Sequence, residues 1–381
     1  MMALLNSSDY RAAAKRRLPK GLFEYIDRGT EAELAMDDIR RSLDAIKFRP
    51  SVLTGHSSSD MTVSLFDRTY PTPLIIAPTA LAGLVSHDGE TKLARIAGRL
   101  GIPFCVSTQS VTAIDDIRKG APDAELWLQL YVWRNRDLTW GLLDRARNSG
   151  VSTLVITADT PLSPKRDYNQ RNGFSVPFVP SVRGICDVAS RPGWLCSVML
   201  RYLMTTGMPT YAHYPAEFKT AITRAAIAED IKIENGISWD DIVEIRKHWT
   251  GRIIIKGVLS VDDAIKARAL GVDGIVVSAH GGRNFDVAEV PAEVLPEIVE
   301  AVGDQMIVMA DSGIRRGSDA LKYLALGADA VMIGRLPLYG LAAGGEQGAF
   351  DILTMLIEEM QSNLVFAGAK DIDAFRKNGI A

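Results

Sequence analysis

The sequence predicts a (β/α)8 barrel, and three observations support this fold class. Eight short apolar runs recur along the 381-residue chain, amphipathic segments separate most of them, and several of these segments close with glycine. Continuous apolar runs without polar alternation are typical of parallel strands whose two faces are both covered by helices. An open doubly wound sheet is the main alternative, but no G-x-G-x-x-G follows the first run and eight strands favour closure.

The predicted elements can be followed along the chain in order. The strands are "PLIIAP" from Pro73, "IPFCVST" from Ile102, "LWLQLYV" from Leu126, "TLVITAD" from Thr153, "IIIKGV" from Ile253, "GIVVSAH" from Gly274, "MIVMADS" from Met306 and "AVMIGR" from Ala330. Helices are expected at "GETKLARIAGRLG", "DDAIKARALG" and "SDALKYLALGA", each of which ends with a glycine suited to a helix C-cap.

The spacing of the strands predicts how the single domain, residues 1–381, is organised. The fourth strand ends near Asp159 and the fifth starts near Ile253, so a long insertion is expected in the fourth βα loop. The predicted parts are a cap region over 1–70 that contains the helix "SSDYRAAAKRRLPKGLFEYIDRG", the barrel over 71–159 and 239–345, the insertion over 160–238, and a C-terminal helical segment over 346–381.

Composition limits the function classes that fit the chain. Apolar residues make up 47% and charged residues 23%, and the net charge of -3 gives no reason to expect a nucleic-acid partner. The three cysteines have no disulfide or metal-ligand spacing, which favours a reducing, cytoplasmic compartment and no metal site. The most lipophilic segment, "GWLCSVMLRYLMTTGM", is interrupted by Arg201 and is too short to span a bilayer, although it could lie on a membrane surface.

Polar residues end almost every predicted strand. Barrel enzymes build their active sites at the C-terminal ends of the strands, so these residues are candidates for one shared site. They are Thr79, Ser107, Gln129 with Tyr131, Thr157 with Asp159, Lys256, Ser278 with His280, Asp311, and Gly334 with Arg335.

The last two strands and the fifth carry the clearest signals for an anionic ligand. "DSGIRRGSD" and "IGRLP" place glycines and arginines where barrels commonly bind phosphate, and Arg315 and Arg335 could neutralise it. Lys256 ends an apolar strand, so its ammonium needs a negative partner or an anionic cofactor. A Schiff-base lysine is an open alternative.

His280 is the candidate general base, because a histidine near neutral pKa can accept a proton when another group fixes its tautomer. Asp159, at another strand end, is the candidate for that orienting group. Arg283 and Arg166 could bind a carboxylate through their guanidinium forks. The phenols of Tyr25 and Tyr131 could bind the same carboxylate or the reacting oxygen.

These motifs together resemble a known family. "LPKGLFEYIDRG", "APTALAG", "LQLYV", "ITADTP", "IIIKGV", "SAHGGRNFD", "DSGIRRGSD" and "IGRLPLYGLAAGGEQG" are similar to the FMN-dependent 2-hydroxy acid oxidases and dehydrogenases, which include glycolate oxidase, lactate dehydrogenase and mandelate dehydrogenase. The resemblance runs in order over nearly the whole chain. It implies FMN as the cofactor and a small 2-hydroxy acid as the substrate.

The resemblance also implies a role for each matching residue. Pro78, Thr79, Ala80, Ser107, Gln129, Thr157, Lys256 and Ser278 would surround the isoalloxazine and ribityl groups, and Asp311, Gly313, Arg315, Gly334 and Arg335 would complete the ribityl and phosphate site. Tyr25, Tyr131, Arg166 and Arg283 would hold the substrate, His280 would act as base, Asp159 would orient it, and Lys256 would stabilise negative charge on the flavin.

The implied reaction oxidises an (S)-2-hydroxy acid, lactate- or mandelate-like, to the 2-oxo acid. Hydride and carbanion routes both remain open. The apolar segment at residues 190–210 is similar to that of membrane-associated dehydrogenases, which predicts a quinone acceptor and peripheral contact with the inner face of the plasma membrane. The resemblance to the family as a whole implies a homo-oligomer, a tetramer. The alternatives are an oxygen-using oxidase that produces hydrogen peroxide, a lysine-dependent aldolase and a non-catalytic FMN-binding protein.

Three positions depart from the family pattern. Ala279 stands where asparagine usually precedes the base, Ser312 where glycine is common, and Gln109 where the family often has an aromatic or small residue.

Overall fold

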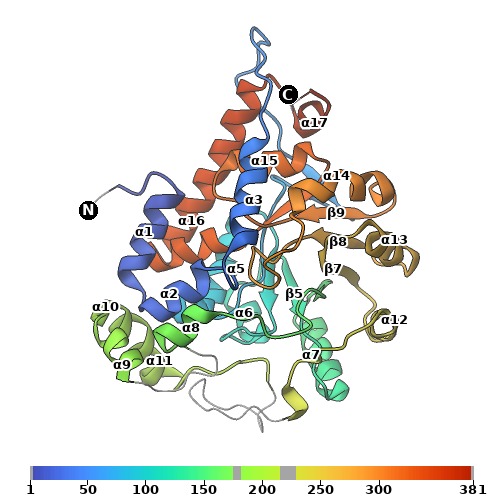
Figure 1. The fold of residues 1–381 in the computed structure, drawn as a ribbon. Coiled ribbons are helices and arrows are strands. Elements are labelled where there is room, and N and C mark those ends of the chain that lie inside the picture. The colour runs from blue at the N-terminus through green and yellow to red at the C-terminus, as the bar shows by residue number, and fades with distance from the viewer. Residues whose placement is uncertain (1–2, 175–181, 215–228, 379–381) are drawn as a thin grey trace.

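Eight parallel strands close into a barrel in the computed structural model, which describes residues 3–174, 182–214 and 229–378 (Figure 1). Around the barrel the strands follow the order β10-β3-β4-β5-β6-β7-β8-β9. They are β3(Leu74–Ile76), β4(Phe104–Ser107), β5(Leu126–Leu130), β6(Thr153–Thr157), β7(Arg252–Val258), β8(Gly274–Val277), β9(Ile307–Ala310) and β10(Ala330–Ile333). Each predicted strand overlaps one of these, so the predicted (β/α)8 barrel is confirmed.

The barrel interior is filled with apolar side chains and is closed at its N-terminal end. One buried cluster gathers residues from all eight strands, among them Trp127, Ile254 and Met309. A two-stranded hairpin, β1(Val63–Leu65) and β2(Arg68–Tyr70), contributes Leu65 and Tyr70 to the same cluster. Since the hairpin precedes β3, it plugs the end of the barrel opposite the predicted site. The apolar strand pattern did not reveal this hairpin.

Helices form the outer layer of the molecule and bury the outward faces of the strands (Figure 1). They are α4(Ala82–Val85), α5(Gly89–Leu100), α6(Ile114–Gly120), α7(Arg136–Asn148), α12(Trp239–His248), α13(Val261–Ala269), α14(Pro291–Val302), α15(Gly317–Ala325), α16(Arg335–Phe366) and α17(Ile372–Asn378). The three helices predicted at 89–101, 262–271 and 318–328 are confirmed as α5, α13 and α15. Gly101 follows α5 with a φ of 66°, a left-handed conformation that glycine adopts without a steric cost.

The N-terminal region forms three helices beside the barrel: α1(Ser7–Arg17), α2(Lys20–Asp27) and α3(Leu34–Ala45). The prediction of one helix through this region is wrong, because the chain turns at Leu18 and Pro19. Proline has no N–H for the helical ladder and disfavours a helical conformation in the residue before it. The break gives α2 its own direction, and α2 carries Tyr25 to the mouth of the barrel.

The fourth βα loop contains short helices that pack against the N-terminal helices and α4. They are α8(Asp167–Asn172), α9(Val182–Ala189), α10(Pro192–Trp194), a π-helical stretch (Leu195–Leu200), α11(Arg201–Thr205) and a 3-10 turn (Glu229–Ile231). The Trp194 indole donates to the Leu84 carbonyl at 2.7 Å, which ties the insertion to α4. Residues 175–181 and 215–228 of the predicted insertion, and 379–381 of the predicted C-terminal segment, lie outside the described residues. Within the described residues, no helix is long and apolar enough to cross a membrane.

Candidate active site

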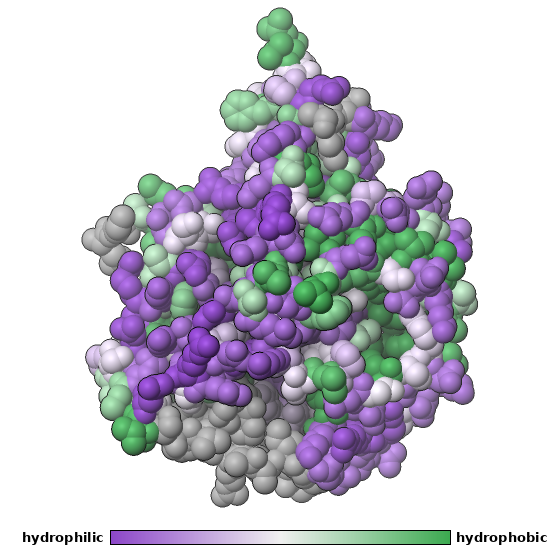
Figure 2. Space-filling view, in the orientation of Figure 1, coloured by the Kyte–Doolittle hydropathy of each residue, from purple (hydrophilic) through white to green (hydrophobic). Residues whose placement is uncertain are grey.

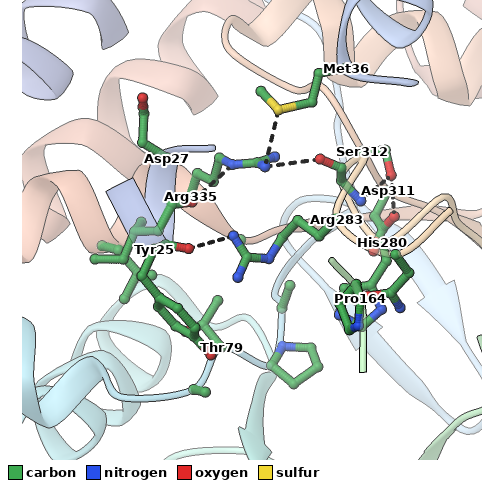
Figure 3. Close-up of a pocket in the computed structure, with 18 of the residues that line it drawn as sticks. Tyr25, Asp27, Met36, Thr79, Pro164, His280, Arg283, Asp311, Ser312 and Arg335 are labelled. Carbon is green, nitrogen blue, oxygen red and sulfur yellow. Dashed lines mark hydrogen bonds between the residues drawn. The ribbon is translucent and has the colours of Figure 1, made fainter. Parts of the chain in front are cut away.

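A cavity of about 1060 Å³ opens at the C-terminal ends of the barrel strands (Figure 3). It brings together nearly all the residues that the sequence predicts for the site. The lining includes Tyr25, Pro78, Thr79, Ala80, Ser107, Gln129, Tyr131, Thr157, Arg166, Lys256, His280, Arg283, Asp311, Gly313, Arg315, Gly334 and Arg335. The two remaining predicted residues, Asp159 and Ser278, lie behind this surface and bond to His280 and Lys256.

His280 and Asp159 form a hydrogen-bonded pair at the ends of β8 and β6. The His280 Nδ1 lies 2.9 Å from an Asp159 carboxylate oxygen, while the Nε2 atom has no hydrogen-bond partner in the described part of the chain. Although burial alone would raise it, the His280 ring and the Lys256 ammonium hold the pKa of Asp159 below its usual value. An ionised Asp159 therefore holds the proton on Nδ1 and leaves Nε2 able to accept one.

Lys256 lies in the wall of the cavity and is buried in an ion pair. Its Nζ lies 2.8 Å from an Asp311 carboxylate oxygen and donates to the Ser278 hydroxyl at 2.7 Å. Burial disfavours the charged amine, but Asp311 and Asp159 outweigh this effect and raise the pKa of Lys256. A Schiff-base lysine needs a neutral amine. The pairing therefore disfavours the aldolase alternative and places a fixed positive charge beneath the cavity.

Two arginines concentrate positive charge on the side of the cavity nearest Tyr25. The guanidiniums of Arg166 and Arg283 lie 5.3 Å and 5.0 Å from the centre of the Tyr25 ring. Burial, together with the neighbouring Arg166 cation, lowers the pKa of Arg283. The Arg166 Nε is buried without a partner in the described residues. Mutually repelling cations at one spot favour an anionic ligand there.

Uncharged polar groups lie side by side across β4, β5 and β6. The Gln129 side-chain oxygen accepts from the Ser107 hydroxyl at 3.3 Å, and its amide donates to the Thr157 hydroxyl at 3.1 Å. This row offers donors and acceptors along one wall of the cavity. Tyr131 follows it, and burial raises its pKa to about 12, so its phenol stays protonated and can donate.

The arginines in the loops after β9 and β10 differ in how many of their N–H groups are already hydrogen-bonded. Arg335 donates to the backbone carbonyls of Ile26 at 3.1 Å and Gly281 at 2.9 Å, so its guanidinium joins the N-terminal helices to the barrel (Figure 3). Arg315 is exposed, and its side chain has no partner among the described residues. Both arginines predicted to neutralise a phosphate lack a carboxylate partner in the described residues and keep their charge, but only Arg315 has its whole guanidinium free of hydrogen bonds there.

The structure adds lining residues that the sequence did not single out. Arg40 of α3 reaches the Gly313 carbonyl, and its buried Nε has no partner in the described residues. Asn284 donates to the Thr160 hydroxyl and to the Asp159 carbonyl, both at 2.8 Å. Because Asn284 stands four residues after His280 in the quoted motif, its position could have suggested a role.

Insertion residues also reach the cavity. Phe174 packs against Tyr25 with ring centres 5.5 Å apart, and Tyr211 lines the same cavity. Neither residue belongs to a strand end, so no local sequence signal marks either one. Gln109, one of the three departures from the family pattern, lines the cavity as well.

Comparison with known proteins gives consistent results. The family model described as FMN-dependent dehydrogenase matches residues 14–381. The chain is 39% identical over 378 residues to an L-lactate dehydrogenase of Pseudomonas paraeruginosa, covering 97% of this chain and 96% of that protein. An L-lactate dehydrogenase of Caulobacter vibrioides is 37% identical over 386 residues, covering 100% and 98%. Among solved structures, the monotopic membrane protein (S)-mandelate dehydrogenase matches with a TM-score of 0.92 and 34% identity, covering 100% of both chains.

Proposed function

The chain belongs to the FMN-dependent dehydrogenase family, and we propose that it oxidises a lactate- or mandelate-like (S)-2-hydroxy acid to the 2-oxo acid in the cavity at the strand ends. One observation carries the proposal: the His280–Asp159 pair lies in the same cavity as the Arg166 and Arg283 cations. A base beside an anion site suits a substrate that carries a hydroxyl and a carboxylate on one carbon.

The chemistry of the cavity fits FMN. Arg315, whose side chain has no partner in the described residues, supplies positive charge for a phosphate. Arg40 is paired with Asp319 and Asp44, and its unpartnered Nε–H supplies a further donor. Ser107, Gln129 and Thr157 supply neutral hydrogen-bonding groups for the ring system, and Lys256 supplies a nearby positive charge. When bound, the flavin accepts the two electrons that leave the substrate.

The protein residues would bind the substrate and move its proton. Arg166 and Arg283 bind the carboxylate, and the Tyr131 phenol donates to the substrate hydroxyl oxygen. His280 Nε2 accepts a proton from the hydroxyl or from Cα, and Asp159 stabilises the imidazolium that results. Lys256 stabilises the negative charge that develops as electrons leave the substrate.

The insertion supports a membrane quinone as the electron acceptor. Its apolar edge, formed by Leu195, Leu200, Leu203 and Met204, consists of side chains that are 37%, 45%, 53% and 70% exposed. Figure 2 shows apolar surface at the lower left, where Figure 1 places α9, α10 and α11. Apolar side chains on short helices are suited to the boundary between lipid headgroups and acyl chains. We infer peripheral contact with the inner face of the plasma membrane.

We propose from the family resemblance that the protein forms a homo-oligomer, specifically a tetramer. A second exposed apolar group supports self-association: Val52, Leu53 and Phe366 are 81%, 101% and 76% exposed. Multi-angle light scattering of the detergent-solubilised protein tests this state, and a monomer at all concentrations would exclude it.

Anaerobic flavin reduction tests the proposed function. The purified protein with FMN should bleach when (S)-lactate or (S)-mandelate is added, whereas the (R)-enantiomers serve as controls. Failure of a panel of 2-hydroxy acids to reduce the bound flavin would reject the proposal. Reoxidation should be faster with a quinone analogue than with oxygen, and equal rates would favour the oxidase alternative.

A further inference from the structure

Ser312 occupies a backbone conformation that favours glycine. Its φ is 85°, and it lies between Asp311 and Gly313 at the C-terminal end of β9. Among the described non-glycine residues with positive φ, only His280 and Ser312 line the active-site cavity. A non-glycine residue in this region is strained and persists where the surrounding contacts hold it. The side chain of Ser312 therefore has a role that glycine could not fill.

The Ser312 hydroxyl joins two parts of the site. It donates to an Asp311 carboxylate oxygen at 2.8 Å and accepts from the Gly281 N–H at 3.0 Å. The other Asp311 oxygen lies 2.8 Å from Lys256 Nζ. Ser312 thus connects the buried ion pair to the loop that carries the proposed base, and Figure 3 shows it beside Asp311.

A second hydroxyl completes a ring of hydrogen bonds. The Ser278 hydroxyl accepts from Lys256 Nζ at 2.7 Å and from the His280 N–H at 3.0 Å. The two consecutive N–H groups of His280 and Gly281 are therefore each held by a serine, and both serines bond to the Lys256–Asp311 pair. His280 itself has a φ of 52°, so the two serine hydroxyls hold a strained turn in place.

We propose that Ser312 is a positioning residue that couples the charge of the Lys256–Asp311 pair to the orientation of the His280–Gly281 turn. Its O–H draws electron density from Asp311, so Asp311 neutralises Lys256 less completely. Its oxygen gives the Gly281 N–H an acceptor that keeps the His280 ring against Asp159. The backbone of Ser312 is fixed independently, because the Tyr323 hydroxyl donates to its carbonyl at 2.8 Å.

The direction of each effect follows from the bonds. Without the hydroxyl, Asp311 pairs more fully with Lys256, so less positive charge is available to a reduced flavin and the flavin midpoint potential falls. The Gly281 N–H loses its acceptor, the turn loosens, and kcat falls by about tenfold, the size expected when one neutral hydrogen bond is lost. The KM should change less, because Arg166 and Arg283 remain.

Two substitutions separate the hydroxyl from the backbone conformation. Ser312→Gly removes the hydroxyl and relieves the positive-φ strain, whereas Ser312→Ala removes the hydroxyl and keeps the strain. We expect the glycine variant to unfold at the same or a higher temperature than the parent and the alanine variant at a lower one. Both should show the same fall in midpoint potential and in kcat. Leu53→Gly is the control, since it relieves a φ of 58° at a fully exposed residue far from the site.

A parent-like midpoint potential and kcat in Ser312→Gly would overturn the proposal and leave Ser312 with a local backbone role only. The inference rests on the proposed function, so one measurement is made on the FMN-free protein. Hydrogen exchange of the Gly281 amide should accelerate about tenfold in both Ser312 variants and not in Leu53→Gly. Unchanged exchange would also reject the coupling. If exchange accelerates but no 2-hydroxy acid reduces the parent flavin, the positioning role stands and the proposed substrate class fails.

Discussion

His280 depends on its neighbours more than on its own position in the chain. Asp159 holds its Nδ1, Ser278 holds its backbone N–H, and Asn284 in turn holds Asp159 through its carbonyl. The two contacts that involve Asp159 join the end of β6 to the loop after β8, so the ring is oriented by the closed barrel. A small change in Asp159 should therefore disable His280, the proposed base, without removing it.

Asp159→Asn should lower kcat by about a hundredfold or more. An asparagine amide does not stabilise the imidazolium, and it can favour the wrong histidine tautomer. Stopped-flow measurement of flavin reduction checks this expectation, and FMN affinity should stay close to that of the parent. A rate within threefold of the parent would show that another group accepts the proton.

The same pair makes a pH-dependent contribution to stability. Because the pKa of Asp159 is lower in the folded state, its ionised form stabilises the fold above the usual aspartate pKa of about 3.9. That contribution is lost as the pH falls through the lower, folded-state pKa. The difference in free energy of unfolding between the parent and Asp159→Asn, measured with urea, should therefore be complete at pH 7 and shrink below about pH 4. A difference that grows in acid would contradict the pKa direction.

Lys256→Met should destabilise the FMN-free protein by about 3–5 kcal/mol, because it leaves the Asp311 charge buried without its partner. The matched control is the double variant Lys256→Met with Asp311→Asn, which removes both charges and should recover most of that loss. Chemical denaturation of the three proteins measures the effect. Equal instability of the single and double variants would mean that the lysine stabilises mainly through packing.

At the scale of elements, α2 links the insertion to the active site. Its first N–H groups, on Lys20 and Gly21, donate to the Asp187 carboxylate of α9 at 2.9 Å and 3.1 Å. At its other end, the Tyr25 carbonyl accepts from Arg283 at 2.5 Å and the Ile26 carbonyl accepts from Arg335. One short helix is therefore held by the insertion at its start and by barrel arginines at its end.

Asp187→Ala should lower the free energy of unfolding by about 1 kcal/mol, because α2 loses the acceptor at its N-terminus. Hydrogen exchange at the Lys20 and Gly21 amides should become faster for the same reason. Asp187→Asn, which keeps an acceptor oxygen, is the control and should lie close to the parent. Exchange measured by mass spectrometry on α2 peptides distinguishes them. Protection that is unchanged in the alanine variant would show that another group caps the helix.

Strands and insertion differ in how well the sequence predicts them. Each strand is a continuous apolar run because both faces are buried, and its polar terminal residue points to the mouth, so the barrel and residues such as Gln129 and His280 could be found. The helical periodicity of the N-terminal segment predicted one helix, but Pro19 divides it into α1 and α2. Phe174 and Tyr211 reach the cavity only after the insertion folds back over the barrel, and no local pattern encodes that contact.

At the scale of the whole molecule, we expect that the apolar edge of the insertion can be mutated without affecting catalysis in the barrel. Replacing Leu203 and Met204 together with aspartate should reduce binding to anionic lipid vesicles by at least about tenfold, since two apolar groups are lost and negative charge is added. Turnover with a soluble dye should remain near that of the parent. The control replaces Val243 of α12 and Ile265 of α13, which are 40% and 38% exposed, with aspartate and should leave vesicle binding intact. Equal loss in both variants would argue against a specific membrane edge.

The hairpin that plugs the barrel has a kinetic consequence. With β1 and β2 filling one end, the acid that delivers electrons and the acceptor that removes them both approach from the other end. Because the substrate and the acceptor use the same entrance, we expect them to bind in turn. The 2-oxo acid then leaves before the oxidant reaches the reduced flavin. Initial-rate plots at several fixed acceptor concentrations should therefore run parallel, the pattern of an enzyme that alternates between two stable forms.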